Sequence, residues 1–454
     1  MRSVRLSLVF ISFGLALAGC SSQSGTALAP LATQSTNVSR SAASLAAYPI
    51  SLQAFPISLS AYPSSLGALP VSLSALPICQ PGSGSGPNTT VPCGDLKRVA
   101  PASIPAGTPA SALAGYQPLH LQGAYGVTSA AISGGTGQTV AIVSAFIDKY
   151  IEQDLGVYRS TFGLPACTVA SGCLTIEVPN GNRPLPDDAW GEETALDTEM
   201  VSAICPNCKI VVIEAKSAKI SDLAAAVDQA AGENAIAISN SYAIPEDSKT
   251  DGLQSHYNHS NVAIIVGAGD TGYGANFPAV SPNVVAVGGT SLVQNPDGTF
   301  APQTVWAGTG SGCSAYIAKQ KWQTDIGCKN RSVNDIAVVA DPQTGVAGYS
   351  TYGNGWAVYG GTSIASPIVA GLYALAGNTK GMKDASGLYA APQGSLAWIL
   401  GTNGTCSPTA LYLCTATGPA YNGPAGNGVP YGLAAFADPD AKPTPPPKPS
   451  PSPK

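Results

Sequence analysis

Residues 209–238 have the sequence KIVVIEAKSAKISDLAAAVDQAAGENAIAI, which is a strand, a helix and a second strand in order. The first apolar run is Lys209–Ile213 and the last is Ala235–Ile238. Between them lies a helical pattern, with Ser221 as the predicted N-cap and Gly232 as the predicted stop. Continuous Val and Ile runs joined by a helix are typical of parallel strands that are buried on both faces.

Similar apolar runs occur at Val140–Val143, Val262–Val266 and Val284–Val287. Strand runs that alternate with helical patterns predict an α/β domain with a mostly parallel central sheet, which we place at residues 106–436. The composition agrees, because a chain that is 44% hydrophobic and 10% charged can bury a large core. The formal net charge of -5 gives no reason to expect nucleic acid as a partner.

The N-terminus resembles a bacterial lipoprotein signal. Arg2 and Arg5 precede the apolar run Leu6–Ala18, which is too short for a transmembrane span, and small residues stand directly before Cys20. We therefore expect residues 1–19 to be a signal peptide and a lipid on Cys20 to anchor the exported protein to a bacterial membrane, in the periplasm or at the cell surface. The alternative is an ordinary signal peptide with a chance Cys.

Low-complexity sequence flanks the predicted domain. Residues 20–105 are predicted to be a tether, in which a seven-residue unit with one Pro per copy repeats from Ala47 to Ser74. Proline in every unit opposes both helix and sheet, so we expect an extended spacer, and docking of its regular apolar positions is the alternative. Residues 437–454 are predicted to be a Pro-rich tail.

Of the 11 cysteines, ten remain once Cys20 is set aside, and they form five pairs of close neighbours along the chain. Local pairing is the simplest expectation for an oxidising compartment, although sequence does not determine connectivity. The expected pairs are Cys79–Cys93, Cys167–Cys173, Cys205–Cys208, Cys313–Cys328 and Cys406–Cys414. The CxxC spacing of the third pair leaves a redox or zinc motif as its alternative.

A nucleophilic serine is indicated by Gly360-Gly-Thr-Ser363, which an apolar run of helical length follows. The glycines let the backbone turn tightly beside the serine hydroxyl, and Pro367 fits the first turn of the helix. The same tetrapeptide recurs at residues 288–291, where the residues that follow predict a strand running into a turn. Ser363 is therefore the candidate nucleophile.

The nucleophile needs a base, and the three histidines of the chain lack a suitable context. His120 stands alone, whereas His256 and His259 lie in a polar stretch where solvated side chains are expected and a metal pair is the alternative. Glu193 and Asp197 are four residues apart on a predicted helix, so both lie on one face. Like-charge repulsion raises one pKa of such a pair, which suits Glu193 to exchange protons with a hydroxyl in acid. A solvated acidic helix face is the alternative.

A third acid, Asp270, follows a buried strand in a glycine-rich turn. On its own it is a turn former. In an acidic site, a protonated Asp can donate a hydrogen bond to the oxyanion of a tetrahedral intermediate.

Together these residues resemble the sedolisin, or serine-carboxyl peptidase, family over nearly all of residues 116–436. The other matching landmarks are Leu121–Tyr125, Gly137–Val143, Tyr158–Pro165, Phe277–Pro278, Val287–Leu292 and Ala340–Gly345. The resemblance implies a subtilisin-like three-layer fold. It also implies that Ser363 is the nucleophile, Glu193 the general base and acid, Asp197 the residue that orients Glu193, and Asp270 the oxyanion partner.

The resemblance further implies a substrate-binding strand at residues 239–243, with Ser239, Ser241 and Tyr242 near the substrate. An extended peptide would add there as an extra strand. Ala243 stands where the family usually has Gly, which is expected to narrow the cleft.

Two features depart from the family. Ala397 and Asn422 occupy places where the family's calcium site has Asp, and loss of both carboxylates should weaken calcium binding severely. We therefore expect no cofactor, with an Asn422 hydrogen-bond network in place of the metal, and calcium bound at this degenerate site is the alternative. The family's folded prodomain is not visible in the tether, so neutral pH would restrain the enzyme, because an ionised Asp270 repels an oxyanion.

The sequence thus predicts an exported, lipid-anchored endopeptidase that hydrolyses protein or peptide substrates in acid through an acyl-enzyme on Ser363. The alternative from another class is a catalytically silent surface lipoprotein that binds peptides or cell-wall material. A subtilisin with a His base is a third possibility, and it lacks a suitable His.

Overall fold

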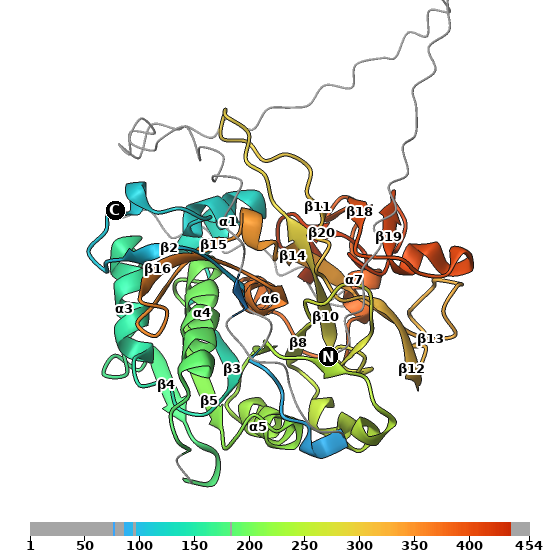
Figure 1. Ribbon diagram of the computed structural model, residues 1–454, viewed down its shortest axis with the longest axis horizontal. Helices are drawn as coiled ribbons and strands as arrows, with labels where there is room; N and C mark the ends of the chain where they lie inside the picture. The colour runs from blue at the N-terminus through green and yellow to red at the C-terminus, as the bar shows by residue number, and fades with distance from the viewer. Residues whose placement is uncertain (1–75, 78–85, 94–96, 182–183, 437–454) are drawn as a thin grey trace, which may run out of the picture. The chain divides into compact units, whose positions relative to one another are not determined.

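A computed structural model describes residues 76–77, 86–93, 97–181 and 184–436 (Figure 1). The predicted signal peptide, Cys20, the seven-residue repeats up to residue 74 and the tail lie outside the described residues. The described residues form three layers, with helices on both faces of a central sheet (Figure 1). The predicted α/β architecture is therefore confirmed.

The central sheet has ten strands in the described part of the chain, in the order β19-β18-β11-β10-β8-β6-β3-β5-β4, with β14 also paired to β10. Its strands are β3 (Thr139–Ala145), β4 (Leu174–Glu177), β5 (Lys209–Ala215), β6 (Ala237–Asn240), β8 (Ala263–Gly267), β10 (Val285–Ser291), β11 (Thr304–Val305), β14 (Ile336–Val339), β18 (Leu400–Thr402) and β19 (Thr415–Thr417). The seven strands from β4 to β10 and β14 are mutually parallel, so their carboxyl ends meet at one edge. All five apolar runs singled out in the sequence are strands of this sheet.

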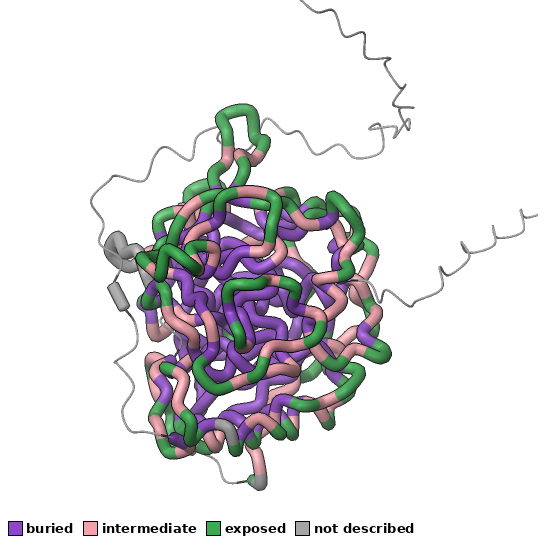
Figure 2. Tube along the Cα trace, turned by 90° about the vertical axis from the view of Figure 1, so that its right-hand side faces the viewer, coloured by how far each residue is buried: buried purple, intermediate pink, exposed green. Residues whose placement is uncertain are grey.

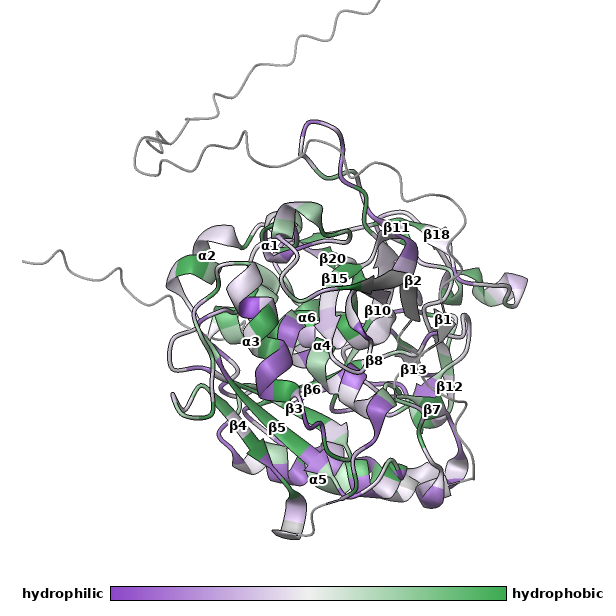
Figure 3. Cartoon of the chain, turned by 60° about the vertical axis from the view of Figure 1, so that its left-hand side comes forward, coloured by the Kyte–Doolittle hydropathy of each residue, from purple (hydrophilic) through white to green (hydrophobic). Residues whose placement is uncertain are grey.

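Helices cover the sheet on each side. One face carries α1 (Pro118–Ala124), α3 (Ile151–Thr161), α4 (Asp188–Ile204) and α6 (Thr362–Ala376). The other carries α5 (Ile220–Gly232) and the 3-10 helix η6 (Ser248–Tyr257). The buried interior and the apolar strands β3, β4 and β5 are visible in Figures 2 and 3.

Short elements complete the described chain. They are the helices α2 (Thr128–Ser133) and α7 (Ser386–Tyr389), the 3-10 helices η3 (Gly86–Asn88), η4 (Ala110–Ala112), η5 (Pro179–Gly181), η7 (Pro342–Thr344), η8 (Pro408–Leu413) and η9 (Ala434–Phe436), and the strand pairs β7 (Ile244–Pro245) with β9 (Asn276–Phe277), β12 (Gly312–Ala318) with β13 (Asn330–Val333), and β17 (Leu396–Ala397) with β20 (Val429–Pro430). No helix of the described chain combines the length and the apolar character that a membrane crossing requires.

The start of helix α5 differs from the prediction. The helix begins at Ile220 with Lys219 as its N-cap, so Ser221 lies in the first turn instead of capping it. The backbone N–H of Ile220 donates to the Thr89 carbonyl at 2.9 Å. A neighbouring segment thus satisfies one of the backbone donors that a capping side chain would otherwise take.

A second sheet, β1-β2-β16-β15, includes part of the predicted tether. Its strands are β1 (Leu76–Pro77), β2 (Lys97–Ile104), β15 (Val346–Ser350) and β16 (Gly355–Gly360). Strand β2 runs antiparallel to β16, with Lys97 opposite Gly360. Because Gly360 is three residues before Ser363, the upstream chain pairs with the strand that leads to the predicted nucleophile.

Residues 86–93 also belong to the folded domain. The Val91 N–H donates to the Ala218 carbonyl at 2.7 Å, and the side chains of Val91 and Cys93 are buried in the core on the α5 side. The domain therefore begins upstream of residue 106, where the sequence placed its boundary. A few apolar residues in a low-complexity stretch were enough to join the core.

Four of the five expected disulfides are formed, namely Cys167–Cys173, Cys205–Cys208, Cys313–Cys328 and Cys406–Cys414. Cys93 is disulfide-bonded too, and Cys79, its expected partner, lies outside the described residues. The Cys205–Cys208 bridge is buried, so this CxxC sequence forms a structural disulfide and not a zinc site.

Candidate active site

Ser363 is the second residue of α6 and follows directly from β16. The N-cap residue Gly361 has φ of 117°, a conformation that favours glycine and explains the glycines ahead of the serine. The sequence placed Pro367 in the first turn of the helix, but it lies further inside α6. Since proline has no N–H, the Ser363 carbonyl lacks its donor four residues on, and the Ser241 hydroxyl at 3.0 Å takes that place.

Glu193 and Asp197 lie on α4, which packs against α6. Both are buried, as is every residue of α4 from Trp190 to Ile204, so a solvated acidic face is wrong for this helix. Helix α4 is fixed at its start by Asp187, whose carboxylate accepts hydrogen bonds from the backbone of Ala189 and Trp190.

The pKa of Glu193 is raised well above its usual value, first by burial and next by the charge of Asp197. A hydrogen bond from Ser363 opposes this rise. This contact is looser than a regular hydrogen bond, and neither carboxyl oxygen of Glu193 has a regular hydrogen-bond partner. Catalytic contacts of this kind tighten when substrate binds.

Ser241 connects Asp197 to the nucleophile. Its hydroxyl lies 2.7 Å from Asp197 Oδ1 and 3.0 Å from the Ser363 carbonyl oxygen. One hydroxyl hydrogen cannot serve two acceptors fully. Burial raises the pKa of Asp197 well above its usual value. The Ser241 hydroxyl is the donor in both contacts, so its hydrogen is shared, and its bond to Asp197 opposes the rise in the pKa of Asp197.

Asp270 is buried in the turn after β8 and is fixed to the first residue of α6. Its Oδ1 accepts from the Thr362 N–H at 2.7 Å and from the Thr362 hydroxyl at 2.8 Å. The Asp270 charge also contributes to the raised pKa of Glu193. The structure thus brings the four predicted residues together from α4, α6 and the turn after β8. Sequence reasoning missed Thr362, although it stands beside Ser363 in the same tetrapeptide.

Glu192 is a second residue that the sequence reasoning set aside. The Tyr359 hydroxyl donates to Glu192 Oε1 at 2.8 Å, and the charge of Glu192 adds to the rise in the pKa of Glu193. Tyr359 belongs to β16, so this contact joins the strand before the nucleophile to the helix of the base. No periodicity in the sequence signals it.

The first half of the predicted substrate-binding strand is not an open edge. Ser239 lies in β6, which pairs with β3 on one side and β8 on the other, so no peptide can add alongside it. The Ser239 hydroxyl contacts Ser366 of α6 at 2.9 Å. Beyond the strand, Ser241 and Tyr242 are buried, and the Tyr242 hydroxyl donates to Asn240 at 2.9 Å. Residues 241–243 follow β6 and lie outside the sheet, so the predicted peptide-binding edge is confined to them.

The histidines make their contacts elsewhere. His256 and His259 both bind Asp228 of α5, at 2.6 and 2.8 Å, so they are paired with an acid and not simply solvated. His120 accepts a hydrogen bond from the backbone of Gln117.

The two calcium positions of the family do not fit a metal here. Ala397 has no side-chain oxygen and lies in β17. Asn422 Oδ1 accepts from the Ala425 N–H at 2.9 Å and closes a turn. This turn is the hydrogen-bond network that the sequence predicted. Within the described ranges, no group of three or more His, Cys, Asp or Glu side chains is arranged to hold a metal ion.

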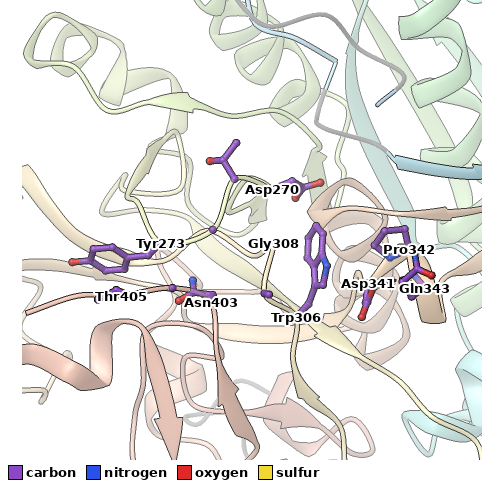
Figure 4. A pocket seen from close by; sticks show the side chains of 13 residues that line it. Asp270, Tyr273, Trp306, Gly308, Asp341, Pro342, Gln343, Asn403 and Thr405 are labelled. Atoms are coloured by element: carbon purple, nitrogen blue, oxygen red, sulfur yellow. Dashed lines mark hydrogen bonds between the residues drawn. The ribbon is translucent and has the colours of Figure 1, made fainter. Parts of the chain in front are cut away.

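A cavity of about 730 Å³ opens next to Asp270 (Figure 4). Its lining comes from the turn after β8, the segment after β11, the loop after β14 and residues 403–405. Of the predicted catalytic residues only Asp270 reaches it.

This site differs from one with a histidine base in three features. A serine lies at the start of a helix, a buried carboxyl pair lies on a neighbouring helix, and a third acid is bound to the residue before the serine. In these features the chain is similar to the sedolisin family. The sequence pattern of the Subtilase family matches residues 187–386, which include all four predicted catalytic residues.

Two family members and one solved structure illustrate the similarity. Kumamolisin from Bacillus sp. (strain MN-32) is 30% identical over 319 residues, 62% of this chain and 55% of kumamolisin. Sedolisin from Pseudomonas sp. (strain 101) is 28% identical over 318 residues, 61% of this chain and 52% of that protein. The chain thus spans about half the length of these relatives.

The solved structure is Pseudomonas sedolisin, a serine-carboxyl proteinase complexed with two molecules of pseudo-iodotyrostatin. It superposes with a TM-score of 0.59 at 25% identity, covering 70% of this chain and 96% of that one. The subtilisin-like fold expected from the sequence is therefore confirmed.

Proposed function

We propose that the protein is an acid-active serine-carboxyl endopeptidase that cleaves protein or peptide substrates through an acyl-enzyme. The observation that carries this proposal is the buried Glu193 carboxyl, which has a raised pKa, has no regular hydrogen-bond partner and interacts with the Ser363 hydroxyl. A carboxyl held this way exchanges protons with the serine near acidic pH.

The steps follow from the contacts. Glu193 takes the proton from the Ser363 hydroxyl as its oxygen attacks the substrate carbonyl, and the oxygen–carbon bond forms. Asp197 stabilises the proton-bearing Glu193, and Asp270 donates a hydrogen bond to the oxyanion. The tetrahedral intermediate collapses, the carbon–nitrogen bond breaks, and Glu193 returns its proton to the leaving amine. Water, deprotonated by Glu193, then hydrolyses the acyl-enzyme.

Cleavage of a denatured protein between pH 3 and pH 8 by the purified full chain tests the proposal, with chelator present. Ser363→Ala and Ser291→Ala form a matched pair, because both serines end the same GGTS tetrapeptide. We expect activity in acid only, lost in Ser363→Ala and kept in Ser291→Ala. A Ser363→Ala variant that retained full activity would contradict the mechanism, and a folded wild-type chain that is silent at every pH would favour the peptide-binding alternative.

We also propose that the protein is exported and anchored to a bacterial membrane by a lipid on Cys20. The support is the charged, apolar and small-residue pattern that ends at Cys20. Metabolic labelling with a fatty acid in a bacterial host, compared between wild type and Cys20→Ala, tests it. Equal labelling of the two chains, or none in either, would overturn the proposal.

A further inference from the structure

The cavity next to Asp270 has two carboxylates and no cationic side chain in its lining. Its thirteen lining residues include the acids Asp270 and Asp341 and contain no Lys, Arg or His. The aromatic rings of Trp306 and Tyr273 complete its walls, and the Tyr273 side chain is 39% exposed. A cavity of this chemistry suits a cationic, donor-rich ligand.

Asn403 adds an independent observation. It is 3% exposed and lines the cavity, and its amide nitrogen donates to the Thr309 carbonyl at 2.6 Å and to the Ser311 hydroxyl at 2.8 Å. These two bonds fix the orientation of the side chain. The opposite atom, Oδ1, is buried and receives no hydrogen bond. An unsatisfied buried acceptor is costly, and a ligand that brings N–H donors would remove that cost.

Asp341 is held at the other side of the cavity. Its Oδ2 accepts from the Ser291 hydroxyl at 2.5 Å, and its Oδ1 accepts from the Gln343 N–H at 2.9 Å. Each carboxylate oxygen has capacity for a further donor. Trp306 and Ala340 both pack against Gly289, where a Cβ atom would lie 2.7 and 2.6 Å from them. The Trp306 ring therefore lies beside the loop that carries Asp341. Figure 4 shows Asp341 and Trp306 toward one end of the cavity and Tyr273 toward the other.

The topology gives the cavity its place relative to the scissile bond. Strand β8, which leads to Asp270, lies between β6 and β10. Residues 241–243 follow β6, whereas Asp341 follows β14, which pairs with β10. We consider a substrate whose acyl side, before the cleaved bond, lies along residues 241–243 and whose scissile carbonyl lies at Asp270. The leaving side of that substrate, after the cleaved bond, then reaches the cavity.

We propose that this cavity is a leaving-side subsite that selects a Lys or Arg side chain of the substrate, through Asp341, Asn403 Oδ1 and the aromatic walls. This inference rests on the proposed peptidase function and names its substrate class: peptides with a basic residue shortly after the cleaved bond.

The test uses the full chain and peptides with a fixed acyl side, in which each of the first three leaving-side positions carries Lys, acetyl-lysine, Leu or Glu. At one position we expect kcat/KM for Lys to exceed that for Leu by about tenfold, with Glu lowest. Acetyl-lysine, which keeps the length and removes the charge, should behave like Leu. Asp341→Asn should reduce the ratio of Lys to Leu to about one, and the exposed-turn control Asp297→Asn should leave it unchanged.

Binding to the Ser363→Ala variant separates this inference from the proposed function. If wild type cleaves none of the peptides, the peptidase proposal fails, and calorimetric titration of the same peptides still tests the cavity. Tighter binding of the Lys peptide, lost with Asp341→Asn, supports the subsite. Equal values for Lys and Leu at all three positions, or a Lys preference that survives Asp341→Asn, overturns it.

Discussion

Two groups of buried acids on neighbouring helices differ in how their oxygens are used. On α3 and α4, Asp154 and Glu199 accept backbone hydrogen bonds from Thr351 and Tyr349, at 2.8 and 3.0 Å. Burial raises the pKa of both. Glu193 lies on the same helix as Glu199 and its pKa is raised for the same first reason, but no backbone donor reaches it. Burial alone therefore does not distinguish the proposed catalytic acid, whereas carboxyl oxygens without a backbone donor and beside a serine do.

The largest expected difference between the two groups is in activity. Glu193→Gln removes the proton acceptor and should lower kcat by about 10³-fold or more, while Glu199→Gln should keep most of the activity. Initial rates at the acid optimum, with circular dichroism to verify folding, measure both. Comparable losses in the two variants would mean that the carboxyls of α4 act structurally as one set.

Asp270 offers the next largest effect. Asp270→Ala removes the oxyanion donor and should lower kcat by about 10²-fold to 10³-fold. Asp270→Asn keeps an amide donor that does not ionise, so its activity should extend further toward neutral pH than that of wild type. The pH profile of kcat for the three chains distinguishes these outcomes, and identical profiles for wild type and Asp270→Asn would exclude Asp270 as the neutral-pH restraint.

The buried acids outside the site should control how stability depends on pH. Burial raises the pKa of Asp148 to about 8, and those of Asp154 and Glu199 also rise. The folded state thus holds protons that the unfolded chain releases above about pH 4. The stability from this proton uptake is fully present below about pH 4 and is lost as the pH rises toward 8.

Each such group contributes a slope of about 1.4 kcal/mol per pH unit within its window. Thermal unfolding should therefore show a higher Tm at pH 4 than at pH 8. Asp148→Asn, which can still accept the hydrogen bond from the Tyr150 N–H, should flatten this dependence. A Tm that rises with pH would refute the assignment.

The smallest effect concerns the upstream segment. A chain that begins at residue 106 lacks β2 and the buried residues Val91 and Cys93, and it leaves one edge of β16 unpaired. We expect a loss of roughly 3 kcal/mol in the free energy of unfolding, together with self-association through the exposed edge. Urea unfolding and light scattering, compared with a chain that begins at residue 76, would reveal both.

The sequence predicted the layers of the fold because Val-rich and Ile-rich runs such as Lys209–Ile213 report burial on both faces directly. It also singled out four candidate catalytic residues that the structure brings together, since each stands in a short local pattern. It did not predict that Pro367 would free the Ser363 carbonyl for Ser241, nor that Tyr359 would contact Glu192, because such contacts join residues more than 100 positions apart. The same holds for β2, whose pairing with β16 has no local signature.

The attachment of the upstream chain also has a mechanical consequence. A force that pulls the chain from its N-terminal side acts first on the two residues of β1. It then acts on residues 89–91, which are held by backbone hydrogen bonds with Ala218 and Ile220. Because β1 is paired with β2, part of the load passes to β2 directly, and the remainder is borne on the α5 side. Residues 89–91 thus fix the chain to the α5 side at a point upstream of β2, the strand that pairs with β16 ahead of Ser363.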